Sequence, residues 1–250
     1  MGVVVGVFSA KGGVGKSLVA TNLASVFSAI HNISSALIDL NAGLGCADQL
    51  LDLEAERTWS DLLPVLDELT PQHLSLAITE HDTGLHLLAC PENPEHHALL
   101  RPDSLEALLE VFRQEYSLVI LDTPTGMGDL AETAFLQADI RLVLLTPDAP
   151  TLRATQRYTT ALAGDDHPAG LVLNQYSRGA PITPQEIREF LDIPLLSVLP
   201  VDQTAVWANV SYGQPCALNR KRGLGRALRK LAQTTLKAAR NSELWESNGG

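Results

Sequence analysis

The 250-residue sequence contains only three cysteines, Cys46, Cys90 and Cys216. They lie far apart and form no C-x-x-C pair, which argues against a disulfide framework, a zinc ribbon or an iron–sulfur site. This cysteine usage is typical of a protein in a reducing compartment, so we expect a cytoplasmic location.

Long apolar runs and linkers are absent as well. No stretch approaches the roughly 18 to 20 apolar residues that span a bilayer, and the first strand-like run begins at Val3, which leaves no room for a signal peptide. No internal repeat and no Gly/Ser-rich or Pro-rich linker divides the chain. With 45% hydrophobic residues, the sequence can bury one sizeable core. We therefore expect one domain over residues 1–240 and a polar tail at 241–250.

Acidic residues outnumber basic ones, but the charges are unevenly distributed. The net charge is −11. Residues 220–240 contain eight Lys or Arg and no acid, so this stretch carries +8 and the rest of the chain −19. An acidic body disfavours general nucleic-acid binding, while the basic stretch could hold an anionic partner locally.

Apolar, β-branched runs alternate with amphipathic helical stretches along the chain. Val3–Phe8 is such a run, and apolar residues at helical spacing follow it at 17–30. The other expected strands lie at 36–39, 85–89, 118–122, 140–145, 171–173 and 195–199. The other expected helices lie at 60–68, 103–116, 130–138, 151–163, 183–191, 203–211 and 224–239. Because parallel strands need right-handed crossovers, the alternation predicts an α/β fold with a single doubly wound, mostly parallel sheet and helices on both faces.

The turn after the first strand has the composition of a phosphate-binding loop. It reads Ala10-Lys11-Gly12-Gly13-Val14-Gly15-Lys16-Ser17. Glycines let backbone N–H groups surround a β-phosphate, Lys16 would neutralise the β- and γ-phosphates, and the Ser17 hydroxyl would ligate Mg²⁺. The segment predicts a P-loop NTPase that binds ATP or ADP with Mg²⁺ through Lys11, Gly12, Gly13, Val14, Gly15, Lys16, Ser17 and Leu18. The alternative is a glycine-rich turn with two incidental lysines.

This loop has Ala10 where the usual motif has glycine, and a second lysine, Lys11, follows directly. It thereby resembles the deviant Walker A motif, K-G-G-x-G-K-S, of the ParA and MinD family of ATPases. The resemblance implies that Lys11 reaches across a homodimer to the partner's nucleotide, so that dimerisation depends on ATP. In other phosphoryl-transfer enzymes, a cationic side chain supplied in this way increases the reaction rate by about 10³- to 10⁵-fold. A solvated loop lysine is the alternative interpretation.

Two further segments resemble the switch regions of this family. Leu37-Ile38-Asp39-Leu40-Asn41-Ala42-Gly43-Leu44 is similar to switch I. Leu118-Val119-Ile120-Leu121-Asp122-Thr123-Pro124-Thr125-Gly126 is similar to a Walker B strand that runs into switch II. The resemblance implies that Asp122 binds Mg²⁺ through water, and that Asp39 supports either the ion or the loop.

Asn41 departs from the family pattern, in which a second switch I aspartate positions the attacking water. An amide can orient water but cannot accept its proton at neutral pH. We therefore expect slow hydrolysis with catalytic contributions from Lys11, Lys16, Asp39, Asn41 and Asp122. The alternatives are that Asn41 is merely tolerated, or that another acid such as Asp48 positions the water.

Two later segments are similar to the adenine contacts of this family. Asn174 follows a predicted strand, and its amide can both donate to and accept from the adenine edge. Leu199-Pro200-Val201-Asp202-Gln203 resembles the proline-centred loop beside the base, which implies contacts from Pro200 and Asp202. Asn and Asp are also ordinary turn formers, which is the alternative. The absence of an N/T-K-x-D motif disfavours guanine.

Within the family, residues 84–91 and 182–187 are more similar to the pilus-localisation ATPases of the CpaE and TadZ type, to MinD and to the flagellar-number ATPase than to plasmid-partition proteins. The resemblance implies an ATP-dependent dimerising switch that positions a macromolecular cargo, with an unidentified cargo or activator as its protein partner. Partners would recruit it to a pole, the membrane or the nucleoid. A metabolic or metallochaperone ATPase on the same fold is the alternative, and the lack of paired cysteines argues against it.

The basic stretch predicts an amphipathic helix from Leu224 onward. Its leucines would pack on the domain and leave its charges solvated. The alternative is that these charges bind DNA phosphates, as in a DNA-partition ATPase, or anionic lipid. The candidate surface consists of Arg220, Lys221, Arg222, Arg226, Arg229 and Lys230.

Overall fold

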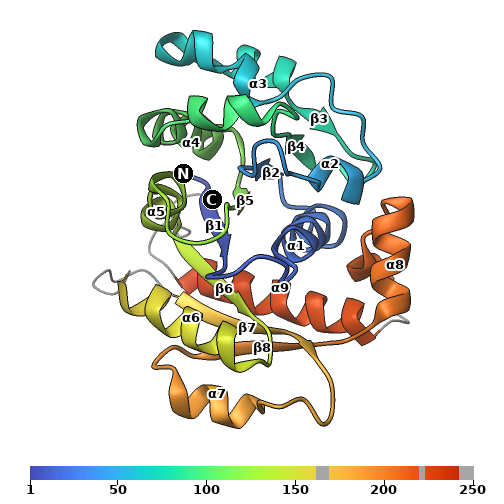
Figure 1. Ribbon diagram of the computed structural model, residues 1–250. Coiled ribbons are helices and arrows are strands. Elements are labelled where there is room, and N and C mark those ends of the chain that lie inside the picture. The colour runs from blue at the N-terminus through green and yellow to red at the C-terminus, as the bar shows by residue number, and fades with distance from the viewer. Residues whose placement is uncertain (162–168, 220–222, 242–250) are drawn as a thin grey trace.

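The computed structural model describes residues 1–161, 169–219 and 223–241, and its strands form one central sheet (Figure 1). From edge to edge the strands lie in the order β3, β4, β2, β5, β1, β6, β7, β8. Their bounds are β1 Val3–Phe8, β2 Ser35–Asp39, β3 Thr79–Glu80, β4 His86–Leu88, β5 Leu118–Asp122, β6 Ile140–Leu145, β7 Ala169–Tyr176 and β8 Leu195–Pro200. All neighbouring pairs are parallel except β3 and β4. The predicted doubly wound α/β sheet is therefore confirmed.

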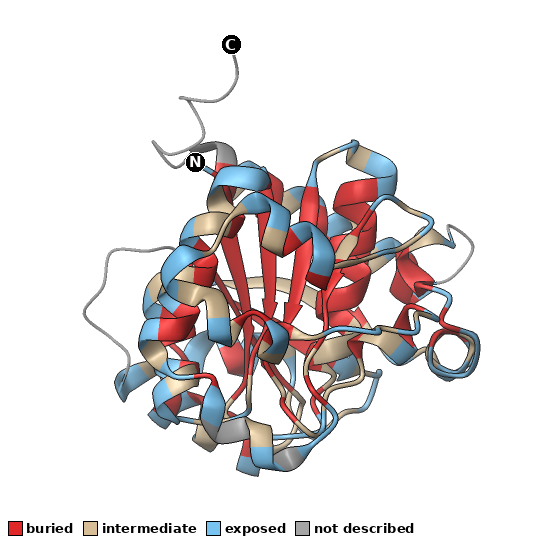
Figure 2. Ribbon diagram, turned by 90° about the horizontal axis from the view of Figure 1, so that it is seen from above, coloured by how far each residue is buried: buried red, intermediate tan, exposed pale blue. Residues whose placement is uncertain are grey.

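Helices cover both faces of this sheet. They are α1 Lys16–His31, α2 Ala47–Leu50, α3 Pro71–Ala77, α4 Pro102–Glu115, α5 Asp129–Gln137, α6 Ala149–Ala161, α7 Pro184–Phe190, α8 Gln203–Tyr212 and α9 Gly223–Asn241. Apolar residues of α1, α2, α8 and α9 form one core with one face of the sheet, and those of α3 to α7 form a second core with the other face. Figure 2 shows the resulting pattern, with buried strands between helices whose outer sides are exposed. Among the described residues, no helix is long and apolar enough to cross a bilayer.

The segment between β2 and α4 differs from the expected pattern. Two 3-10 helices, η1 (Trp59–Asp61) and η2 (Leu63–Glu68), replace the single helix expected at 60–68. Pro64, at the start of η2, lacks a backbone N–H and interrupts the helical hydrogen bonds. The other 3-10 helices are η3 Pro94–Leu99 and η4 Cys216–Leu218. The short elements β3, α2 and α3 have too few residues for a clear periodic signal.

Helix α9 packs on the core and leaves part of its charge in solvent. Its buried leucines are Leu224, Leu228, Leu231 and Leu236. Its exposed basic side chains include Arg226, Lys230 and Lys237. Arg229 instead donates to the carbonyl oxygens of Ala217 and, at 2.7 Å, of Leu218. The remaining residues of the candidate anionic-partner surface, Arg220, Lys221 and Arg222, lie outside the described part of the chain, as do residues 242–250 of the expected tail.

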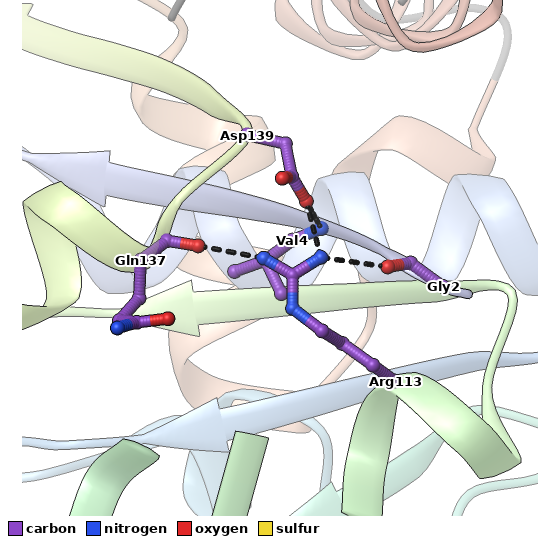
Figure 3. Close-up of polar contacts among 5 residues, drawn as sticks. All are labelled: Gly2, Val4, Arg113, Gln137 and Asp139. Atoms are coloured by element: carbon purple, nitrogen blue, oxygen red, sulfur yellow. Dashed lines mark hydrogen bonds and ion pairs between the residues drawn. The ribbon is translucent and has the colours of Figure 1, made fainter. Parts of the chain in front are cut away.

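Arg113 joins α4 to three other segments at the amino-terminal edge of the sheet (Figure 3). Its Nη1 donates to Asp139 Oδ2 at 2.6 Å and to Gly2 O at 2.8 Å, and its Nη2 donates to Gln137 O at 2.7 Å. The same Asp139 oxygen accepts from Val4 N at 2.7 Å. The ion pair is largely buried, and both of its partners make further hydrogen bonds. It therefore stabilises the amino-terminal ends of the strands, opposite to the predicted phosphate loop.

We expect Arg113→Leu to lower the free energy of unfolding by about 2 to 3 kcal/mol, because it leaves the buried Asp139 carboxylate without its cation. Urea denaturation followed by circular dichroism measures this change. The control is Arg188→Leu on α7, since the exposed Arg188 makes a single 3.4 Å contact with Pro184 O. Equal losses in the two variants would contradict a structural role for the Arg113 cluster.

Candidate phosphate-binding site

The predicted phosphate loop connects the carboxyl end of β1 to the first turn of α1, at the centre of the sheet. Gly13 and Gly15 have φ angles of 77° and 90°, a left-handed conformation that favours glycine. A Cβ atom at Gly15 would lie 2.5 Å from Asn174 Nδ2, so a side chain here would be strained by the backbone conformation and would displace the Asn174 amide. The loop therefore exposes its backbone at the amino terminus of α1, where an anion is stabilised by the N–H groups and the helix dipole.

Lys16 is the cation of this site. Lys16 is only 8% exposed. Its Nζ donates to Ser9 Oγ at 3.1 Å and to Thr125 Oγ1 at 2.7 Å. Burial lowers the pKa of Lys16, while the nearby Asp122 and Asp39 oppose this shift. The ammonium is thus held at the phosphate loop by two hydroxyl groups and two acidic neighbours.

Asp122 ends β5 next to Asp39, which ends the neighbouring β2. The Asp122 side chain is fully buried, and no residue in the described part of the chain gives either carboxylate oxygen a hydrogen bond of normal geometry. Burial raises the pKa of Asp122 to about 8, and Asp39 adds to the shift, whereas the Ser17 hydroxyl and Lys16 lower it. Such an unpartnered carboxylate near Ser17 fits a hydrated Mg²⁺, which keeps water ligands and takes few protein oxygens.

Asp39 has a different environment, because protein donors occupy both of its oxygens. Oδ1 accepts from the backbone N and the Nδ2 of Asn41, both at 2.9 Å, and Oδ2 accepts from Ala47 N at 3.2 Å. Asn41 Nδ2 also lies 3.2 Å from Asp122 O. Two roles were expected for Asp39. These contacts favour support of the loop at residues 40–46, which includes the end of the candidate switch I (residues 37–44).

An open cavity of about 960 Å³ extends from the phosphate loop across both candidate switches. This volume suits a nucleotide-sized ligand. Asn41 lines this cavity, whereas Asp48, the alternative residue for positioning the attacking water, does not. Lys11 and Gly12 are exposed and are not among the lining residues. The lining residues from the predicted site are Gly13, Gly15, Lys16, Ser17, Leu18, Asn41, Asn174, Pro200 and Asp202.

The residues expected to contact adenine line the cavity but also have partners within the protein. Asn174 Nδ2 donates to Val14 O at 2.8 Å, and its Oδ1 accepts from Gln175 N at 2.9 Å. Asp202 is the N-cap of α8 and accepts from Ala205 N at 3.0 Å. Asn174 therefore supports the phosphate loop, and Asp202 has the helix-starting contact of the alternative interpretation.

Sequence reasoning missed one wall of the cavity, which α8 supplies. The lining residues of α8 recur at helical spacing and are Gln203, Val206, Trp207 and Val210. Trp207 is 72% exposed, whereas Ala205 and Asn209 are buried on the other side of the helix. The helical spacing of Val206, Trp207 and Val210 was the available signal, since such spacing places apolar side chains on one side of a helix.

Buried amides hold this helix in place. Asn22 Nδ2 of α1 donates to Asn209 Oδ1 at 2.7 Å, and Asn209 Nδ2 donates to Leu50 O of α2 at 2.8 Å. Asn22 Oδ1 accepts from Ala217 N at 2.7 Å. These bonds tie α8 to the helix that follows the phosphate loop and to the helix that follows the candidate switch I.

Comparisons with known proteins agree with this geometry. A family model described as "ParA: NUBPL iron-transfer P-loop NTPase" matches residues 1–235. The septum site-determining protein MinD of Bacillus subtilis is 28% identical over 244 residues, which cover 94% of this chain and 90% of that protein. A ParA family ATPase from Chlorobium tepidum superposes with a TM-score of 0.85 at 22% identity, covering 93% of this chain and 99% of the other. MinD from Pyrococcus horikoshii complexed with Mg-ADP gives 0.83 at 23% identity, with 96% and 98% covered.

Proposed function

This chain belongs to the ParA family of P-loop NTPases, and on that basis we propose that it is an ATP-dependent switch that dimerises around its nucleotide and positions a macromolecular cargo. The observation that carries the proposal is the cavity at the phosphate loop, whose wall contains Lys16 and Ser17, with the buried Asp122 carboxylate close to both residues. A Mg²⁺ ion bound there would neutralise phosphate charge, with Ser17 and Asp122 as the residues that hold it, directly or through water.

Dimerisation is supported by the surface around the cavity. Exposed apolar side chains that line the cavity come from the candidate switch I, from the loop after β8 and from α8: Leu44, Val201, Trp207 and Val210. Leu44 is 89% exposed, and exposed apolar groups gathered at one face are typical of an interaction surface. Lys11 is exposed beside its own cavity and does not line it, which fits a lysine that serves a partner's nucleotide.

The positioning role is supported by the relatives, since the Bacillus subtilis protein is a septum site-determining protein. Among the described residues, no group of three or more His, Cys, Asp or Glu side chains has an arrangement that could hold a metal ion. DNA partition is a second candidate because Arg226, Lys230 and Lys237 are exposed on α9. Retention of the dimer on DNA with a steep salt dependence would favour that candidate.

With a non-hydrolysable ATP analogue and Mg²⁺, we expect the wild-type protein to change from a 26.9 kDa monomer to a dimer of twice that mass. Lys11→Ala should remain monomeric, because it removes the cation that crosses to the partner's phosphates. Light scattering at tens of micromolar protein, about the range in which a modest interface populates, measures both masses. Lys230→Ala, which removes an exposed lysine far along the sequence, should dimerise like wild type. A wild-type protein that stays monomeric would contradict the proposal.

A further inference from the structure

The bond between Lys16 and Thr125 connects the phosphate loop to the loop at residues 123–128. This loop contains the end of the segment that resembles switch II (residues 118–126) and is called switch II from here on. Thr125 Oγ1 accepts from Lys16 Nζ at 2.7 Å, and both residues line the nucleotide cavity. A second bond, from Gly126 N to Ser9 O at 3.0 Å, joins the same two segments. Any ligand atom that takes Lys16 away from Thr125 therefore acts directly on switch II.

The number of donors on the ammonium decides how many partners Lys16 can keep. A lysine ammonium has three N–H donors, and two of those on Lys16 point to Ser9 and Thr125. One donor is left, which is enough for a β-phosphate. A triphosphate requires two, because its β- and γ-oxygens both approach the same lysine. ATP must therefore displace one hydroxyl that ADP can leave in place.

Of the two hydroxyls, that of Thr125 is the easier to displace. Ser9 is 1% exposed, follows β1 directly, and donates from its own hydroxyl to Lys11 O at 2.7 Å. Thr125 is exposed and lies in a loop without regular secondary structure. Moving Ser9 would disturb the phosphate loop itself, whereas moving Thr125 disturbs only a surface loop.

Resting on the proposed function, we propose that the Thr125 hydroxyl competes with the γ-phosphate for Lys16, so that ATP releases switch II and ADP does not. Thr125 is then a positioning residue that distinguishes the two nucleotides. Its hydroxyl selects against ATP because ATP must break its bond to Lys16. The loop that is then released carries the exposed Met127.

The test compares the affinities for ADP and for a non-hydrolysable ATP analogue in Thr125→Val, which keeps the shape of the side chain and removes the hydroxyl. Affinity for the ATP analogue should rise about three- to tenfold, which is the range of an ordinary hydrogen bond and below that of a bond to a charged group, because water reaches this site. Affinity for ADP should not change. In wild type the bond between Lys16 and Thr125 is present before and after ADP binds, and in Thr125→Val it is absent in both states. Thr125→Ser should keep the wild-type ratio. Calorimetry on the Lys11→Ala background keeps dimerisation out of the comparison.

A second measurement follows switch II itself. On the Lys11→Ala background, which prevents dimerisation, hydrogen exchange of the backbone amides at 125–128 should increase with the ATP analogue but not with ADP. Adding Thr125→Val to this background should remove the difference between the nucleotides. Equal changes in both affinities, weaker binding of the ATP analogue by Thr125→Val, or a Thr125→Ser variant that behaves like valine would overturn the inference. Failure of any nucleotide to bind would instead contradict the proposed function.

Discussion

Replacing Lys16 with alanine is expected to abolish measurable nucleotide binding. Among the described residues that line the cavity, Lys16 is the only Lys or Arg. Behind it lie the Asp39 and Asp122 carboxylates, so a triphosphate that entered the variant would meet two buried acids without their cation. Loss of one partner from a buried charge pair costs about thirtyfold to several thousandfold in affinity. Calorimetric titration with Mg-ADP measures the loss.

Lys16→Ala also changes the protein in the absence of nucleotide, so its interpretation requires a second variant. Lys16→Gln keeps most of the side-chain length and can still donate to Thr125, but it has no charge. We expect it to lose nucleotide binding as well, which separates the role of charge from that of packing. Thermal unfolding of both variants reports whether the fold persists, and Lys230→Ala serves as the control for loss of an exposed lysine. Undiminished affinity in either Lys16 variant would exclude this cavity as the phosphate site.

At saturating Mg-ATP, Asn41→Asp is expected to raise basal ATP hydrolysis from a low wild-type rate by about 10², the lower part of the range for general-base catalysis. An aspartate can accept the proton of the attacking water, whereas an amide cannot. Nucleotide affinity should change little, because the new group acts on the water and not on the phosphates. Steady-state phosphate release from the two purified proteins measures the difference.

The structure adds a cost to this substitution. Asn41 donates to Asp39 Oδ1 at 2.9 Å, and an aspartate would replace that donor with a third carboxylate near Asp39 and Asp122. Without Mg-ATP the variant should therefore unfold at a lower temperature than wild type, and the Mg²⁺ ion should offset part of the loss. Asn41→Ala is the matched control, because it loses the donor without gaining a base and should show reduced stability with no gain in turnover. Brisk wild-type hydrolysis that Asn41→Asp leaves unchanged or lowers would point to Asp39 or Asp48 instead.

The sequence alone was sufficient for the fold class and for the position of the phosphate loop. Both depend on local patterns: β-branched runs such as Val3–Phe8 specify buried strands, and the right-handed crossover rule then restricts their connection. Glycines at 13 and 15 are needed for the loop conformation itself. The segment at 60–68 was less predictable, since Pro64 divides a helical pattern whose period alone does not reveal the break.

Only the tertiary structure decided which atoms of the site already have a hydrogen-bond partner within the protein. Thr125 is 109 residues from Lys16, and Asn174 is 160 residues from Val14, so no local pattern links either pair. Their contacts arise because the strand order places β5, β1 and β7 within one sheet, with loops at a common edge. A sequence motif identifies the chemical groups that can meet a nucleotide. The hydrogen-bond partner of each group depends on chain segments that folding brings together, which is why Asn174 supports the phosphate loop and Asn41 bridges the acidic ends of two strands.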